Sequence, residues 1–174
     1  MEYKSRAEVN EKDKWDLTKI FLTEELAKKA MNEIPTLVDE VVKYKGNILK
    51  DSNTLLNFYK SYEKMSREAE KVYMYAKLEA DTDTKNNDYK EFSMKAEKMF
   101  EDMFAKTSFI NAEILSSDYE LVKKFIAENK ELEEYAFDLE KTFRYKEHTL
   151  SKEEEHLITL ASNAFGTGHD VFYN

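Results

Sequence analysis

The sequence predicts an all-α fold: a helical bundle with a long antiparallel helical hairpin, followed by shorter helices toward the C-terminus. Only 3 of the 174 residues are glycine and 1 is proline, too few for the tight turns of a β-sheet protein. Apolar residues instead recur in steps of three and four, the spacing of one helical face. A chain of this length can bury a core without crosslinks. The lack of cysteine excludes disulfides and thiolate chemistry.

Residues 1–22 are predicted to form an N-terminal arm. The arm is polar except for Trp15, Leu17, Ile20 and Phe21. We expect the indole of Trp15 to anchor the arm to the helical body, because a large aromatic side chain gains most from burial.

Residues 23–115 are predicted to be a long-helix region. Thr23 can cap its first helix. Pro35 predicts a kink or break near residues 31–34, because it removes a backbone hydrogen bond, and Gly46 is the expected C-terminal stop. The apolar face of this helix comprises Leu26, Ala30, Ile34, Leu37, Val38 and Val41.

The long hairpin is predicted at about residues 52–109. Its first helix, residues 52–80, has the most regular apolar seam in the chain: Leu55, Phe58, Tyr62, Met65, Ala69, Val72 and Ala76. Polar residues 81–87 interrupt the pattern. The seam then resumes with Tyr89, Phe92, Ala96, Met99 and Met103. Two long helices joined by a short polar connection form an antiparallel pair.

Residues 116–174 are predicted to form shorter helices. Ser117 with Glu120, and Ser151 with Glu154, fit the capping box that satisfies the free amides at a helix start. The apolar face between the two caps comprises Leu132, Tyr135, Ala136, Leu139 and Phe143. The face after the second cap comprises Leu157, Leu160, Ala161 and Ala164.

Charge and hydropathy argue against two classes of partner, nucleic acids and membranes. Charged residues make up 36% of the chain, with a net charge of −9 and both signs interspersed, so a nucleic-acid backbone would be repelled on average. No apolar run approaches the roughly 18 residues of a membrane span, and no signal-peptide pattern follows the start. We therefore expect a cytoplasmic protein that binds neither nucleic acid nor membrane.

The three histidines are weak candidates for chemistry. His156 with Glu153 is half of a di-iron carboxylate motif, but the chain has no second copy, and Glu153 is explained as a residue of the first helical turn. His148 could act as an acid or base, yet no nucleophile or orienting partner can be tied to it. His169 is expected to be exposed.

Two further patterns have a structural explanation. The segment Asp81–Asp83 begins like a calcium loop, but Lys85, Asn86 and Phe92 stand where a ligand, the turn glycine and the bidentate glutamate belong. A helix-to-helix turn explains it better. Four aromatic residues that fall off the main seam predict a second buried face or an interface, which could equally join two copies of the chain. They are Tyr59, Tyr73, Tyr75 and Phe104.

The chain resembles the N-terminal region of the oligoendopeptidase F family, relatives of thimet oligopeptidase. The stretches that are similar occur in the order and at about the spacing of the family: Trp15–Leu17, Tyr75–Asp81, Ser108–Leu115 and Arg144–Glu155. The last stretch is the most specific, and the resemblance covers essentially the whole chain. Ala112 departs from it, because the family typically has proline before the glutamate.

The resemblance implies that the parent protein is a cytoplasmic zinc metalloendopeptidase that cleaves short peptides in a channel walled by helices. The family binds zinc through His-Glu-x-x-His and a downstream glutamate. None of the three histidines here is followed by glutamate. We therefore assign no catalytic, cofactor-binding or metal residue to this chain, and expect the zinc and the catalytic domain to lie beyond Asn174.

Two functions follow as hypotheses. The first is a non-catalytic N-terminal fragment that walls or gates the substrate channel, with its own C-terminal catalytic domain and short peptides as partners. The alternative is a stand-alone helical protein-interaction module without enzymatic activity, including a homodimer. The length of the parent reading frame distinguishes them.

Overall fold

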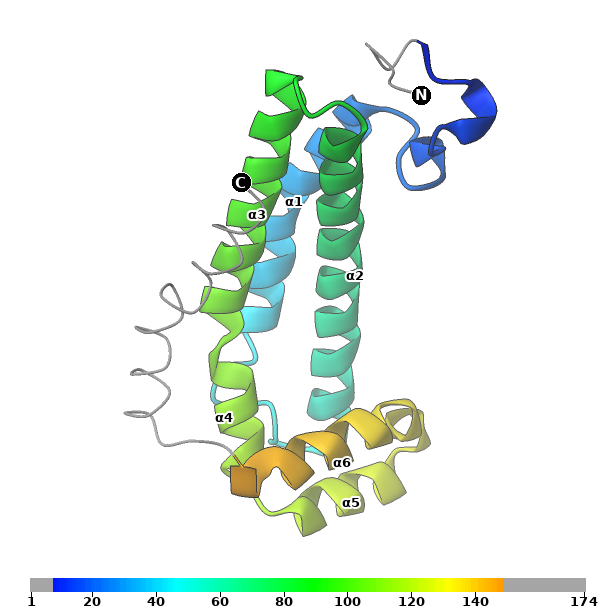
Figure 1. Ribbon diagram of the computed structural model, residues 1–174. Coiled ribbons are helices and arrows are strands. Elements are labelled where there is room, and N and C mark those ends of the chain that lie inside the picture. Colours follow the sequence, from blue (N-terminus) through cyan, green and yellow to red (C-terminus); the bar gives the residue numbers. More distant parts are fainter. Residues whose placement is uncertain (1–7, 149–174) are drawn as a thin grey trace.

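The computed structural model describes residues 8–148 (Figure 1). Within this range the chain is helical and has no strand, which confirms the predicted all-α class. The short 3-10 helices are η2 (Glu11–Asp13), η3 (Leu17–Lys19), η4 (Lys130–Tyr135) and η5 (Tyr145–His148). The α-helices are α1 (Glu24–Val42), α2 (Ser52–Thr82), α3 (Asn87–Thr107), α4 (Phe109–Leu115), α5 (Tyr119–Glu128) and α6 (Ala136–Arg144).

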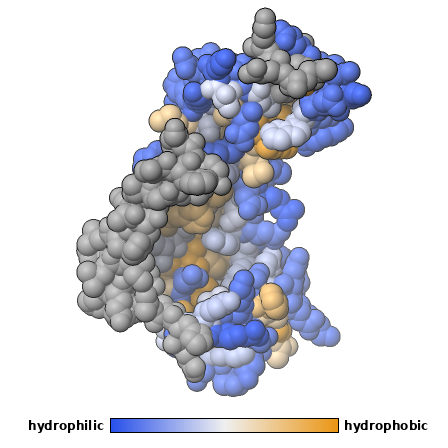
Figure 2. Space-filling model, in the orientation of Figure 1, coloured by the Kyte–Doolittle hydropathy of each residue, from blue (hydrophilic) through white to orange (hydrophobic). Residues whose placement is uncertain are grey.

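The long helices α2 and α3 form the antiparallel hairpin, and α1 packs behind both of them (Figure 1). α4 follows α3 after Ser108, and α5, η4 and α6 cross the lower end of α2. One side of the α2–α3 pair is therefore covered by α1. The space-filling view of the other side shows a hollow with hydrophobic residues between α2 and α3 (Figure 2).

The seam predicted for α2 is its buried face. Leu55, Phe58, Met65, Ala69, Val72 and Ala76 are buried, and Tyr62 is half-buried. The Asp51 carboxylate caps the helix by accepting the Thr54 amide at 2.7 Å. The C-terminus lies at Thr82, two residues beyond the predicted end at Ala80. On α3, Phe92, Ala96 and Met103 are buried as the seam predicts.

Several predictions for α1 need correction. Thr23 does cap the helix, accepting the Leu26 amide at 3.4 Å, but the Leu26 side chain is 45% exposed and Ala27 is buried in its place. The helix runs through Pro35 without a break. Burial of the neighbouring Ile34 and Val38 holds this turn in place despite the missing amide. α1 also ends at Val42, before Gly46.

Gly46 lies in the loop that joins α1 to α2, where it adopts the positive φ of 79° that favours glycine. The Gly46 amide donates to Glu113 Oε2 at 2.7 Å, and the Ile48 amide donates to Glu113 Oε1 at 2.8 Å. Glu113 belongs to α4, so one carboxylate ties this loop to the end of the hairpin. Ile48 is fully buried beside this contact.

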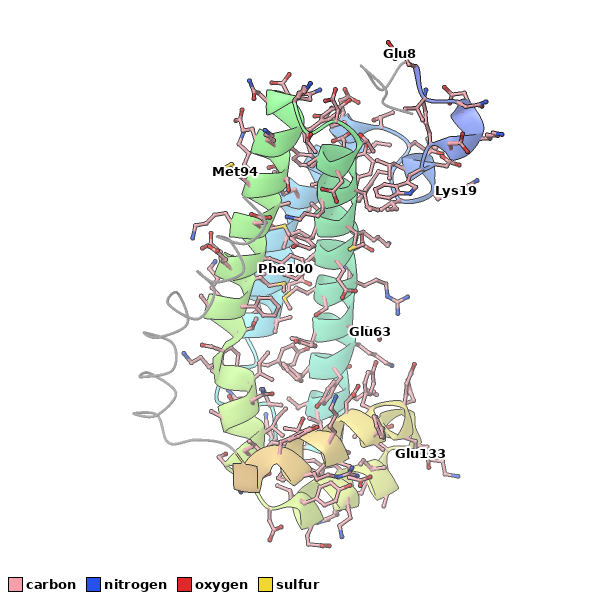
Figure 3. The ribbon with its side chains drawn as sticks, viewed as in Figure 1. Glu8, Lys19, Glu63, Met94, Phe100 and Glu133 are labelled. Atoms are coloured by element: carbon pink, nitrogen blue, oxygen red, sulfur yellow. The ribbon has the colours of Figure 1, made fainter. Side chains whose placement is uncertain are left out.

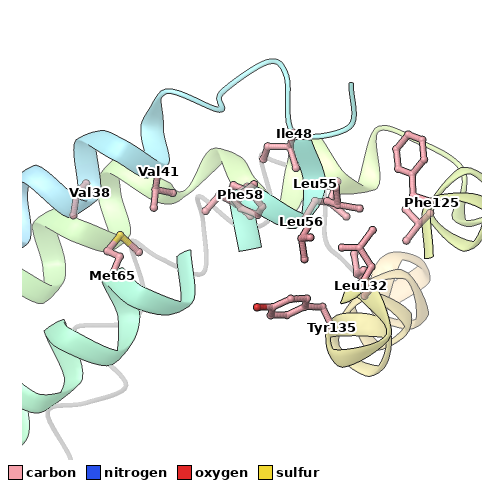
Figure 4. Packing of buried hydrophobic residues seen from close by; sticks show 14 of the residues in the cluster. Val38, Val41, Ile48, Leu55, Leu56, Phe58, Met65, Phe125, Leu132 and Tyr135 are labelled. Atoms are coloured by element: carbon pink, nitrogen blue, oxygen red, sulfur yellow. The ribbon is translucent and has the colours of Figure 1, made fainter. Parts of the chain in front are cut away.

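The larger of the two hydrophobic clusters in the described residues joins α1, α2 and η4 (Figure 4). Phe58 is fully buried in it, and its ring contacts Tyr44 and Tyr59 edge-on, with centroid distances of 5.9 and 5.3 Å. Leu132 and Leu139 join this cluster from η4 and α6. Of the apolar face predicted here, Leu132, Tyr135 and Leu139 are buried, whereas Ala136 and Phe143 are half-buried. The chain divides into a 3-10 helix and an α-helix at Tyr135.

The N-terminal arm does not use its indole as an anchor. Trp15 is 57% exposed, contrary to expectation. Leu17, Ile20 and Phe21 pack instead on the smaller upper cluster, where the Phe21 ring meets Tyr75 edge-on at 5.7 Å. These three apolar side chains lie in η3 or just after it, and together they attach the arm to the helical body better than the single indole of Trp15 would.

The start of α5 also differs from the prediction. Asp118 is its N-cap, and its carboxylate accepts the Glu120 amide at 3.3 Å. The Ser117 hydroxyl instead donates to the carbonyl of Ile114 at 2.9 Å. A carboxylate competes well for the free amides, so the predicted capping box begins one residue too early. The second box, at Ser151, lies outside the described residues.

Candidate functional site

The histidines form no catalytic or metal site within the described residues. His148 ends η5, while Glu153, His156 and His169 lie outside the described residues. In residues 8–148 no three His, Cys, Asp or Glu side chains are grouped so that they could hold a metal ion. Asp81 and Thr82 are the last residues of α2, and the turn to α3 begins at Asp83, whose carboxylate accepts the Lys85 amide at 3.1 Å.

A cleft lined by tyrosines is the candidate binding site of this chain. It has a volume of about 550 Å3, within the range of small-ligand sites, and lies between α2, α4 and the η4–α6 segment. We call it the tyrosine cleft. Its lining residues are Phe58, Tyr59, Tyr62, Glu63, Ser66, Arg67, Glu70, Ile110, Asn111, Ile114, Tyr135, Asp138 and Thr142.

The aromatic wall of the cleft joins α2 to η4. The rings of Tyr59 and Tyr135 stack with their centroids 4.8 Å apart. Burial, and secondarily the Asp138 carboxylate, raises the pKa of the Tyr59 hydroxyl, so this hydroxyl stays neutral and can donate a hydrogen bond. The cleft thus combines a fixed aromatic surface with a protonated phenol close to a carboxylate.

Acidic side chains outnumber basic ones in the cleft. The Tyr135 hydroxyl donates to Glu63 Oε2 at 3.1 Å, while the other Glu63 oxygen pairs with Arg67 on the next turn of α2. Burial and then the Glu63 carboxylate raise the pKa of Tyr135 to about 12. Glu70 and Asp138 form no ion pair with any residue in the described part of the chain. The cleft therefore has an excess of negative charge.

The four off-seam aromatic residues have different surroundings. Tyr75 is buried, as a second buried face requires, and Tyr59 forms the wall of the cleft. Tyr73 packs against Phe100 at a centroid distance of 4.9 Å, and Phe104, which follows Phe100, is 56% exposed. Figure 3 shows Phe100 between α3 and α2. We call the contacting residues Tyr73, Phe100 and Phe104 the hydrophobic strip.

Most of the cleft is not predictable from the sequence. Tyr59 is recognisable as an off-seam aromatic residue and Tyr135 as part of an apolar face, but nothing pairs the two or marks Glu63, Arg67 or Asp138. The two tyrosines lie on elements far apart in sequence. Only the i, i+4 spacing of Glu63 and Arg67 on one helix could have been recognised in advance.

A second unusual group is the buried carboxylate of Glu79 near the upper end of α2. Its side chain is only 7% exposed; Oε1 accepts the Tyr75 hydroxyl at 3.1 Å, and Oε2 has no hydrogen-bond partner among the described residues. Burial raises the pKa of Glu79. Nearby Glu24 raises it further, whereas Lys28 lowers it. The ionised form is therefore the costly one in the folded state.

We expect Glu79→Gln to stabilise the chain increasingly as pH rises. A carboxyl whose pKa is raised on folding favours the folded state below its unfolded-state pKa, and this contribution is lost as pH rises through the folded-state pKa. The glutamine keeps an acceptor for Tyr75 but never ionises. Urea unfolding at pH 4.5 and 7.5 should show a gain on the order of 1 kcal/mol in favour of the variant at the higher pH. An equal difference at both pH values would contradict this account.

None of the helices in residues 8–148 combines the length and the apolar character needed to cross a membrane.

Comparison with known proteins gives one consistent result. The family model described as Oligopeptidase F matches residues 113–174. Group B oligopeptidase PepB of Streptococcus agalactiae is 34% identical over 168 residues, and Oligopeptidase PepF of Bacillus subtilis is 29% identical over 167 residues. These matches cover 97% and 96% of this chain, but the chain spans only 28% and 25% of those proteins.

The fold is also similar to that of a solved structure. The crystal structure of oligoendopeptidase-F from Enterococcus faecium superposes with a TM-score of 0.72 and 25% identity. The superposition covers 86% of this chain and 30% of that chain. The similarity thus extends across the helical hairpin and is not confined to the residues that the family model matches.

Proposed function

Because this chain is a homologue of the N-terminal region of oligoendopeptidase F, we propose that it is the non-catalytic part of a zinc metalloendopeptidase that hydrolyses short peptides. In this proposal the segment walls or gates the substrate channel. Its partners are its own C-terminal catalytic domain and the peptides that enter the channel. We place the whole protein in the cytoplasm.

One observation carries the proposal: nearly the whole chain matches proteins named as oligopeptidases, while it spans about a quarter of their length. The chain has no His-Glu-x-x-His sequence, so its own residues do not fit a catalytic zinc ion. We therefore assign to this segment the role of shaping the substrate channel and controlling access to it. The hollow between α2 and α3 offers a surface for such contacts (Figure 2).

The test compares this chain with a longer protein that also contains the region following Asn174 in the relatives. The longer protein should cleave a quenched fluorescent peptide, lose the activity with a chelator and regain it with zinc. The 174-residue chain alone should cleave nothing. Cleavage by the short chain, or cleavage by the longer protein that resists chelation, would overturn the proposal.

The hydrophobic strip supports a second candidate function, that of a helical protein-interaction module without enzymatic activity. Tyr73 and Phe100 are only half-buried, and Phe104 is more exposed still. Such a strip is typical of a surface that contacts another protein, including a second copy of the chain. A longer protein without peptidase activity, together with a dimeric 174-residue chain, would favour this function.

A further inference from the structure

We propose that the tyrosine cleft binds the cationic side chain of an arginine or lysine residue in a peptide. The cation would lie against the rings of Tyr59 and Tyr62 and pair with the carboxylate of Asp138. The peptide is a substrate of the longer protein, so this part of the inference rests on the proposed function. The binding site itself is a property of the chain described here.

The charge of the cleft selects a cation. Arg67 is already neutralised by Glu63, which also accepts the Tyr135 hydroxyl, whereas Glu70 and Asp138 have no cationic partner among the described residues. An anionic group would be repelled. A purely apolar group would cover these carboxylates without pairing them, which is costly. A guanidinium or ammonium group would be attracted to the cleft and would also pair with its carboxylates.

The aromatic lining fits the same ligand. Tyr59 and Tyr62 are half-buried, so parts of both side chains remain at the surface of the cleft. Phe58 supports them from behind, edge-on to Tyr59 and stacked with Tyr62 at a centroid distance of 6.0 Å. Cations are attracted to the faces of such rings, more strongly when water is partly excluded.

The size of the cleft limits the occupant to a short segment. About 550 Å3 accommodates one long side chain with part of its backbone, but not a helix laid along the whole hairpin. Ile110 and Ile114 of α4 are buried behind the lining of the cleft and make its α4 side apolar. Asn111 adds a polar group at the same edge, where a peptide backbone would pass.

The experiment titrates the 174-residue chain with acetyl-Ala-Arg-Ala-amide and with its citrulline analogue, which has the same shape but no charge. Binding is followed by NMR, with the Tyr59 and Asp138 signals as site reporters. The arginine peptide should shift these signals and bind at least fivefold more tightly than the citrulline peptide. Equal binding of both peptides, or shifts confined to other parts of the chain, would overturn the inference.

Three variants locate the site. Asp138→Asn and Tyr59→Leu should each weaken arginine-peptide binding about fivefold. Glu33→Gln removes the same charge from an exposed position on α1 outside the cleft and should change nothing. Asp138 is exposed, so its variant should fold normally even if Tyr59→Leu does not. An unchanged affinity in Asp138→Asn would contradict the assignment.

Two readouts separate this inference from the proposed function. Sedimentation of the same samples shows whether cleft variants alter self-association in place of peptide binding, which would identify a second copy as the occupant and overturn the inference. Peptidase activity of the longer protein is measured separately. Its absence would sink the proposed function and leave the measured arginine selectivity of the cleft standing.

Discussion

Phe58→Ala should lower the free energy of unfolding by about 3–5 kcal/mol. Phe58 is fully buried where the α1–α2 loop, α2 and the aromatic wall of the tyrosine cleft meet, and its ring contacts Tyr44, Tyr59 and Tyr62. Truncation removes the transfer free energy of a large ring and leaves a cavity that its three aromatic neighbours cannot fill without breaking their own contacts.

Urea unfolding followed by circular dichroism measures this loss. Phe137→Ala is the matched control, because Phe137 lies on α6 but is 69% exposed, and its truncation should change stability by no more than about 0.5 kcal/mol. If both variants lost the same amount of stability, Phe58 would not be the central core residue that its burial indicates. Arginine-peptide binding should also weaken in Phe58→Ala, since its ring supports the cleft tyrosines.

The elements of this fold with strong periodicity were predictable from the sequence. The seams of α2 and α3 are buried almost as written, because a stripe of apolar residues at steps of three and four has one way to leave water in a long helix. The all-α class followed from the same pattern together with the scarcity of glycine and proline. The start of α1 was predictable too, because threonine is a favoured N-cap residue and the Thr23 hydroxyl accepts the Leu26 amide.

The exact ends of elements and the arm were less predictable. Trp15 and Leu26 are apolar, yet both are exposed, because burial depends on which neighbours reach the same place. Gly46 has the left-handed conformation expected of a helix stop, but α1 ends earlier and Gly46 serves the loop instead. Local preferences identify these residues as special without fixing what they contact.

The tyrosine cleft is less predictable still. Tyr59 and Tyr135 stack only because η4 and α6 fold back across the lower end of α2. No spacing along the chain encodes that contact, and the charge balance of the cleft depends on it. A single sequence reveals periodic faces and helix caps, whereas contacts between distant segments need the fold.

Glu113→Ala should cost about 2–3 kcal/mol, the second largest effect expected here. One carboxylate accepts both the Gly46 amide at 2.7 Å and the Ile48 amide at 2.8 Å, and hydrogen bonds to a charged acceptor are stronger than neutral ones. Alanine leaves both amides without this acceptor and frees the loop from α4. Glutamine retains one acceptor oxygen, so Glu113→Gln should lose about half as much.

Hydrogen exchange should quicken at both amides in Glu113→Ala, but not in the exposed control Glu33→Ala. Unchanged protection would mean that the loop is held by Ile48 packing alone, and the carboxylate would then have no structural role.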